Sequence, residues 1–237
     1  MPDSGTLRAR LDRISDRIAA AASRARREPS SVRLIAVSKT FTAEHVLAAA
    51  ESGQRDFGEN KVQEGLLKVA ATSGHDLRWH LIGHLQSNKA RKAVEHFSVI
   101  HSVDSQSLLS RLDDGARATG RTVDLLVQVD LAGEATKFGA RAEEVLPIMT
   151  AARQCHSVRV VGLMTLPPAV DDPESARPYF TALRRLRDDL SREGIDDVML
   201  RELSMGMSHY FEVAIEEGAT QIRIGSAIFG EREYISP

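Results

Sequence analysis

The sequence predicts an α/β protein, a single-domain (β/α)8 barrel with one extra helix at its N-terminus. Strand-like and helix-like segments alternate along 237 residues, and no linker or low-complexity run divides them. Unusual polar residues also gather where the strand-like segments end. Alternation with short connections indicates a parallel sheet, and eight strands favour a closed barrel over an open doubly wound sheet. We therefore expect one domain over residues 1–237, with residues 1–28 packed on the barrel as a helix.

The first expected element is this N-terminal helix. Leu7, Leu11, Ile14 and Ile18 recur at the spacing of one helix face, and the arginines between them form a solvated face. The segment is too charged for a signal peptide, and no stretch of the chain approaches the 18 apolar residues typical of a membrane span. We expect a protein without a membrane segment.

Eight strand-like segments follow in order, with seven amphipathic stretches between them. One amphipathic stretch runs from Thr42 or Ala43 to Glu51, and the last of the seven ends at Gly218. Another begins after Asp172, which we expect to be an N-cap because Pro173 suits the first helical position. The strand-like segments are residues 32–38, 55–58, 77–83, 97–103, 122–130, 158–165, 197–204 and 220–225.

The composition excludes several classes of protein. Hydrophobic residues make up 42% and charged residues 27%, and the net charge of −2 gives no sign of nucleic-acid binding. Cys155 is the single cysteine, which excludes an intramolecular disulfide and fits a reducing cytoplasm. His80 and His84 would suit zinc on a helix, but their segment is strand-like and runs into a turn, so we expect no metal site.

Two loops of small residues lie where such barrels often bind phosphate, after strands seven and eight. The seventh segment ends in Ser204-Met205-Gly206-Met207-Ser208, and the eighth ends in Gly225-Ser226 before a short helix-like stretch. Backbone N–H groups at a helix start point toward an anion, and glycine lets the chain approach it. The two loops form either a phosphate cup or simple tight turns.

Lys39 ends the first strand-like segment and has two interpretations. It is either a solvated charge or a reactive amine at the barrel mouth. Combined with a phosphate cup, a reactive lysine suits an aldolase acting on a sugar phosphate, or attachment of pyridoxal 5′-phosphate (PLP). Arg223 favours PLP, because it lies two residues before Gly225 and can face the same side of the last strand. An arginine can donate to a pyridine nitrogen but cannot protonate it. Its alternative role is an ion pair with Glu202.

Eight motifs, in order, resemble the YggS/PROSC family of PLP homeostasis proteins. They extend from the first strand-like segment to the C-terminus: AVSKT, FGENKVQE, WHLIGHLQSNKA, IHSVDS, GEATKFG, GLMTLPP, LSMGMS and AIEEGATQIRIGSAIFG. The resemblance implies a fold type III PLP barrel, similar to the N-terminal domain of bacterial alanine racemase.

The resemblance also implies roles for individual residues. Lys39 corresponds to the lysine that forms the covalent aldimine with PLP, and Arg223 to the residue that faces the pyridine nitrogen. The implied phosphate binders are Ser208, Gly225 and Ser226. Asn60 and His80 correspond to pocket residues near the ring, and Met205 and Gly206 to residues that line the phosphate loop.

Two positions depart from the family pattern. Ser226 replaces the usual threonine but keeps a hydroxyl and an N–H. Tyr210 stands where the family usually has aspartate, which puts the role of that acid in doubt, and we expect this tyrosine near the phosphate. Lys137 is the best candidate for a second lysine that accepts PLP in transit.

The expected function is to hold and deliver PLP, and so to regulate the cofactor pool and amino-acid metabolism. The expected protein is a cytoplasmic monomer with weak or no turnover, whose partners include apo forms of PLP-dependent enzymes. The alternatives are a PLP-dependent amino-acid racemase and a PLP-free Schiff-base aldolase. Against a racemase, the chain ends at Pro237, without the second domain that supplies the opposing tyrosine in alanine racemases.

Overall fold

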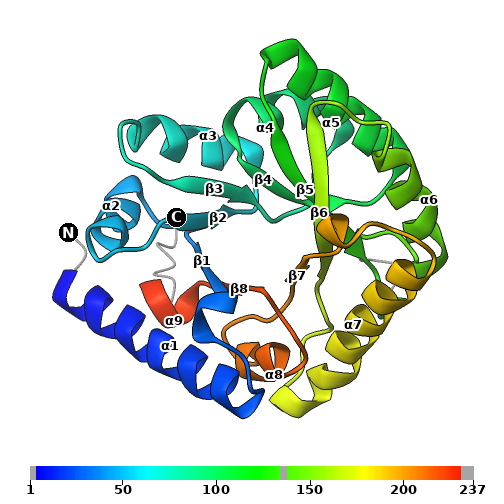
Figure 1. The fold of residues 1–237 in the computed structure, drawn as a ribbon. Coiled ribbons are helices and arrows are strands. Elements are labelled where there is room, and N and C mark those ends of the chain that lie inside the picture. The colour runs from blue at the N-terminus through cyan, green and yellow to red at the C-terminus, as the bar shows by residue number, and fades with distance from the viewer. Residues whose placement is uncertain (1–3, 134–137, 231–237) are drawn as a thin grey trace.

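The structure, a computed structural model, describes residues 4–133 and 138–230 (Figure 1). Eight parallel strands pair in chain order, and β8 pairs with β1 to close the barrel. This confirms the predicted fold class. The strands are β1 (Arg33–Val37), β2 (Asp56–Glu59), β3 (Arg78–Leu81), β4 (Val99–Val103), β5 (Val123–Val129), β6 (Val158–Thr165), β7 (Glu202–Ser204) and β8 (Gln221–Ile224).

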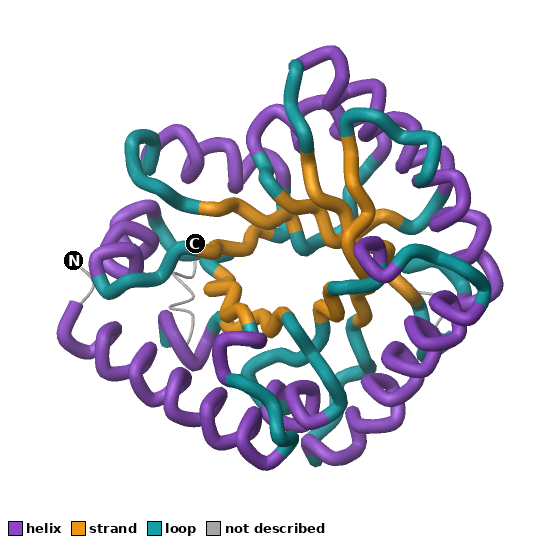
Figure 2. Tube along the Cα trace, in the orientation of Figure 1, coloured by secondary structure: helices purple, strands orange, loops and turns teal. Residues whose placement is uncertain are grey.

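Helices surround the strands as an outer ring (Figure 2). Most residues of the strands are buried, as expected for a parallel barrel covered on both faces of its sheet. The helices are α1 (Ser4–Arg24), α2 (Ala43–Glu51), α3 (Val62–Ala71), α4 (Ala90–His96), α5 (Gln106–Thr119), α6 (Ala142–Ala152), α7 (Arg177–Arg192), α8 (Phe211–Glu216) and α9 (Ser226–Phe229). Within the described ranges, no helix is long and apolar enough to cross a membrane.

The N-terminal helix α1 packs across the outside of α8 and α9 (Figure 1). Its apolar face, which includes Leu7, Leu11 and Ile14, is buried against the barrel as the spacing predicts. On the same side, Arg17 pairs with Glu212 of α8 at 2.9 Å. The helix therefore covers the part of the barrel that carries the last strand and the last short helix.

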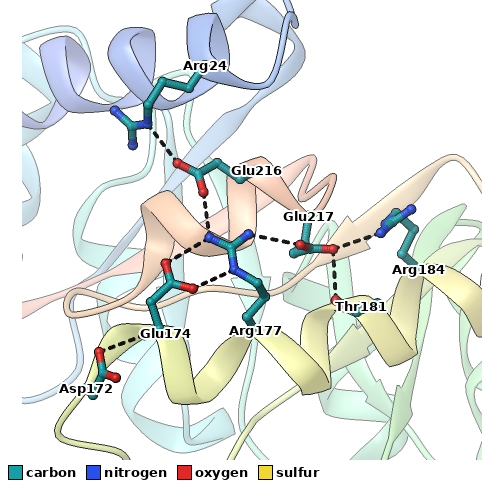
Figure 3. Close-up of polar contacts among 8 residues, drawn as sticks. All are labelled: Arg24, Asp172, Glu174, Arg177, Thr181, Arg184, Glu216 and Glu217. Carbon is teal, nitrogen blue, oxygen red and sulfur yellow. Dashed lines mark hydrogen bonds and ion pairs between the residues drawn. The ribbon is translucent and has the colours of Figure 1, made fainter.

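A network of charged side chains joins α1, α7 and α8 (Figure 3). Arg177 at the start of α7 contacts Glu216 at 2.7 Å and Glu217 at 2.9 Å, and Arg24 of α1 reaches Glu216 from the other side at 2.8 Å. Glu217 also accepts hydrogen bonds from Arg184 and Thr181 of α7. The network joins α1 and α7 to α8, which packs against β8.

Two boundaries differ from the sequence prediction. The segment 197–204 is not one strand, because residues Asp197–Met199 form a 3-10 turn capped by Asp196, and β7 covers only Glu202–Ser204. Asp172 does act as an N-cap before Pro173, but it caps a 3-10 turn, Pro173–Ala176, that leads into α7. In both places an aspartate that bonds a nearby backbone N–H sets the turn.

Candidate functional site

A cavity of about 640 Å³ lies at the carboxyl ends of the strands. Six of the residues singled out from the sequence line it: Lys39, Asn60, Ser208, Arg223, Gly225 and Ser226. They come from the ends of β1, β2, β7 and β8. In barrels of this type the active site lies on this face, because the strand-to-helix loops converge there.

Lys39 lies two residues after the end of β1, and it is half-buried at the wall of this cavity. The next residue, Thr40, has a φ of 71°, which is unusual for a β-branched residue. Its backbone N–H donates to Glu64 Oε1 at 2.6 Å. The strained turn, held by this bond, sets the direction in which the chain leaves Lys39.

A buried ion pair supports the backbone on the other side of Lys39. Lys68 of α3 donates to Glu59 Oε1 and to the carbonyl oxygen of Ser38, both at 2.6 Å. The Ser38 hydroxyl donates to the same Glu59 oxygen at 2.7 Å. Burial raises the pKa of the Glu59 carboxyl, and the bonds from Lys68 and Ser38 oppose that rise. Lys68 was not expected at the site from the sequence, since a lysine on an amphipathic helix is usually solvated.

Asn60 lies at the end of β2, in contact with the loop after β3. A Cβ on Gly83 would lie 2.2 Å from the Asn60 carbonyl oxygen, so only glycine lets the two segments approach this closely. Both residues line the cavity. The close approach fixes Asn60 at the cavity wall.

Arg223 is 3% exposed and projects from β8 into the barrel. Its guanidinium donates to Ser204 Oγ at 2.5 Å and to the Thr165 carbonyl oxygen at 2.9 Å. Burial lowers the pKa of this guanidinium to about 10. Within the described residues no carboxylate pairs with it, and Glu202 instead binds Thr220 and contacts Arg33 and Arg201. The alternative of an Arg223–Glu202 ion pair is therefore wrong.

The two loops of small residues meet at one side of the cavity. Ser226 Oγ lies 3.5 Å from Ser208 Oγ, and Ser226 begins α9, whose first N–H groups lack partners within the helix. Gly225 passes close to β1, where a Cβ would lie 3.2 Å from the Val37 carbonyl oxygen. Hydroxyls and N–H groups converge here as an anion requires.

Three of the residues predicted for the site lie away from the cavity wall. His80 is fully buried inside the barrel, where it bonds Asp56 at the amino end of β2. Met205 is part of the apolar core. Gly206 has a φ of 96° and packs against α8, where a Cβ would lie 2.7 Å from Ala214 Cβ. The resemblance implied His80 as a pocket residue near the ring, whereas its side chain here lies inside the barrel and does not line the cavity. Strand alternation places a side chain inside the barrel but does not give its depth along the barrel axis.

Two other cavity residues, which form a stacked pair, were not expected there from the sequence. His84 and Phe138 stack with ring centroids 3.6 Å apart, although 53 residues separate them in the chain. Tyr210 lines the cavity as the N-cap of α8, and burial raises the pKa of its hydroxyl. Tyr210 was expected in this region as a departure from the family pattern, whereas no local signal marks the stacked pair. Lys137 lies outside the described residues.

The cavity wall carries positive charge. Lys39 and Arg223 contribute two cations, and none of the described residues that line the cavity is acidic. A partly buried site with cations, hydroxyls and helix N–H groups attracts an anion such as a phosphate ester. In its neutral form, the amine of Lys39 is a nucleophile at the same site.

Comparison with known proteins gives a consistent result over almost the whole chain. Residues 9–233 match the alanine racemase N-terminal domain family. The chain is 44% identical to the pyridoxal phosphate homeostasis protein of Aquifex aeolicus, covering 95% of this chain and 98% of that protein. It is 41% identical to the protein of the same name from Pseudomonas aeruginosa, covering 98% of each.

Solved structures agree with these matches. PipY of Synechococcus elongatus, solved with PLP bound, is 43% identical with a TM-score of 0.81, covering 92% of this chain and 100% of that chain. An alanine racemase from Clostridium difficile shares the fold with a TM-score of 0.74 at 14% identity, covering 98% of this chain but 58% of that one. The chain therefore belongs to the family of pyridoxal phosphate homeostasis proteins, within the wider alanine racemase N-terminal domain family.

Proposed function

We propose that the protein binds PLP in the cavity at the strand carboxyl ends and serves to hold and deliver it. The observation that carries this proposal is the combination of Lys39, Arg223 and the Ser208–Ser226 hydroxyl pair around one cavity with no acidic lining among the described residues. A phosphate ester that also has an aldehyde and a ring nitrogen matches these three groups. Its phosphate suits the hydroxyl pair, its aldehyde suits Lys39, and its ring nitrogen suits Arg223. The names of the relatives and the PLP-bound PipY structure support the same ligand.

Each residue has a separate task in this proposal. Ser208, Gly225, Ser226 and the start of α9 hold the phosphate through charge-assisted hydrogen bonds, each contributing roughly 1.5–3 kcal/mol. Lys39 Nζ would hold the aldehyde carbon covalently, with the aldehyde oxygen leaving as water, and Asn60 would border the ring. PLP supplies an electron-withdrawing ring when bound. Arg223 limits this electron withdrawal, because an arginine can donate a hydrogen bond to the ring nitrogen but keeps its own proton.

The proposal favours a carrier over an enzyme. Racemisation needs an acid–base group on each face of the reacting carbon, and each contributes typically 10²- to 10⁴-fold in rate. Lys39 can serve one face, whereas Tyr210 lies near Ser208 at the phosphate side and its raised pKa keeps the phenol neutral. We also propose that the protein is a monomer acting in the cytoplasm, and that apo forms of PLP-dependent enzymes receive the cofactor.

Absorbance spectroscopy tests the central proposal. Protein incubated with PLP should gain a visible band, and borohydride reduction followed by peptide mapping should place the modification on Lys39. Lys39→Ala should abolish the band, while Lys61→Ala, an exposed lysine at the cavity side of β2, should keep it. Pyridoxal without phosphate should bind far more weakly. A band that persists in Lys39→Ala, or equal affinities for the two ligands, contradicts the proposal.

The racemase and aldolase alternatives are tested by activity. Incubation of the PLP-loaded protein with L-alanine in deuterated buffer should leave the α-proton NMR signal intact. Rapid loss of the signal at catalytic protein concentration would favour the racemase, and cleavage of a sugar phosphate by the PLP-free protein would favour the aldolase.

A further inference from the structure

A continuous column of hydrogen-bonded side chains crosses the interior of the barrel. It begins at Arg223 of β8, which donates to Ser204 Oγ of β7 at 2.5 Å. Ser204 Oγ lies 2.9 Å from His101 Nδ1 of β4, and His101 Nε2 lies 3.0 Å from His80 Nδ1 of β3. The last link joins His80 Nε2 to Asp56 Oδ1 at the amino end of β2, at 2.9 Å.

The two ends of the column differ in chemistry and location. Arg223 borders the cavity at the carboxyl ends of the strands. Asp56 borders a second cavity, of about 390 Å³, at the opposite end of the barrel. There Asp56 lies 3.8 Å from Arg33 and 3.9 Å from Arg78. The column therefore spans the barrel from one face to the other.

The chemistry of the ends fixes the position of every proton in the column. An arginine only donates, and an ionised carboxylate only accepts. Since Asp56 accepts, His80 must carry its proton on Nε2, which leaves His80 Nδ1 as an acceptor if the ring is neutral. His101 must then donate from Nε2 and accept at Nδ1. Ser204 donates to His101 Nδ1 and accepts from Arg223, so all the bonds point from Arg223 toward Asp56.

The opposite order fails when the His80 ring is neutral. With its proton on Nδ1, His101 would donate to Ser204, which already accepts from Arg223. His101 Nε2 would then accept from His80 Nδ1. His80 Nε2 would in that case present a lone pair to the lone pairs of Asp56 at 2.9 Å. This repulsion excludes the reversed column.

Burial keeps both imidazoles neutral. His80 and His101 are 0% exposed. Burial lowers the pKa of His80, opposed by its bond to Asp56. The pKa of His101 is held well below its ordinary value by burial first, and then by the neighbouring His80 ring and the charge of Arg223. A neutral imidazole has one donor and one acceptor, as the column requires.

We propose that His101 and Ser204, ordered by His80 and Asp56, are positioning residues for Arg223. They fix the rotamer of the guanidinium, while no described carboxylate pairs with its charge and the carboxylate of the column is four hydrogen bonds away. The other N–H groups of Arg223 are then held toward the cavity. There they serve as rigid donors to the ring nitrogen of the ligand, an assignment that rests on the proposed function.

Nitrogen-15 NMR of the cofactor-free protein tests the column directly. Both imidazoles should show a protonated Nε2 and an unprotonated Nδ1, with signals assigned by their loss in His80→Gln and His101→Gln. An Nδ1–H tautomer or an imidazolium at His101 overturns the proposal. This readout needs no PLP, so it remains informative if the protein does not bind PLP at all.

PLP titration of three variants tests the positioning role. Leucine at position 101 removes donor and acceptor, so His101→Leu should raise the dissociation constant for PLP roughly tenfold, the effect of about one hydrogen bond, and shift the visible band. His101→Gln keeps one donor and one acceptor and should recover most of the affinity. Ile100→Ala, a buried truncation on the same strand, should lower stability without shifting the band. Wild-type affinity and spectrum in His101→Leu overturn the proposal. If His101→Leu does not fold, two other results decide the question. They are the PLP affinity and spectrum of His101→Gln, and the tautomers of the two imidazoles in the wild-type protein.

Discussion

Replacing Lys68 with methionine should destabilise the protein strongly, because it leaves a buried carboxylate without its cation. The Lys68 side chain is 7% exposed and that of Glu59 is 0% exposed. Glu59 Oε2 already lacks a hydrogen-bond partner in the wild-type protein. After the substitution only Ser38 Oγ still donates to this carboxylate. Removing one partner of a buried ion pair costs about 3–5 kcal/mol, so we expect Lys68→Met to lose that much at roughly pH 8.

The loss should depend on pH in a defined direction. Burial already raises the pKa of Glu59 above its unfolded value, and removal of Lys68 raises it further. A carboxyl with a raised folded pKa binds more protons in the folded state. Its contribution to stability is therefore present below the unfolded pKa and is lost as pH rises through the folded one. The deficit of Lys68→Met should grow from about pH 5 to pH 8, by up to about 1.4 kcal/mol per pH unit.

Urea unfolding at several pH values measures this effect. Lys92→Met, which changes an exposed lysine on α4, should stay within about 0.5 kcal/mol of wild type. Adding Glu59→Gln to Lys68→Met should recover most of the loss, since the buried charge is then gone. A loss below about 1 kcal/mol at pH 8, a loss independent of pH, or no recovery in the double variant would refute the reasoning.

Two further substitutions test the cavity wall and the helix network. Gly83→Ala should destabilise the protein by roughly 1–3 kcal/mol and weaken PLP binding, because its Cβ would collide with the Asn60 backbone at 2.2 Å. A Cβ at Gly58 would contact only side chains, so Gly58→Ala should lower the melting temperature less than Gly83→Ala does. Equal losses in the two variants would contradict the proposed backbone collision at Gly83. Arg177→Met should cost about 1–2 kcal/mol by urea unfolding, because both glutamates of α8 keep another partner, and the loss should shrink at high salt (Figure 3). Arg192→Met removes an exposed pair on the same helix and should change little, and an equal loss there would contradict a special role for the network.

The eightfold alternation of strand-like and helix-like segments in the sequence determined the barrel. In such a barrel, the loops that follow the strands converge on one face, so residues in those loops lie there. Within four residues of the ends of their strands lie Lys39, Asn60, Ser208 and Ser226, so their arrival at one cavity needed no tertiary information. Local chemistry likewise set the Asp172 cap. The seventh strand was less well determined, because the apolar residues Val198, Met199 and Leu200 suit a strand and a packed turn equally.

Only the tertiary structure decided how deep each inward side chain lies and which distant residues meet. Alternation along a strand gives the side of the sheet, but the stagger between neighbouring strands sets the layer within the barrel. The resemblance implied His80 as a pocket residue, whereas its side chain lies inside the barrel and bonds His101. The contact of His101 with Ser204 joins residues 103 positions apart, and Lys68 reaches Ser38 from a neighbouring helix. Such bonds form because burial leaves a polar group no partner except those that the closed barrel brings to it.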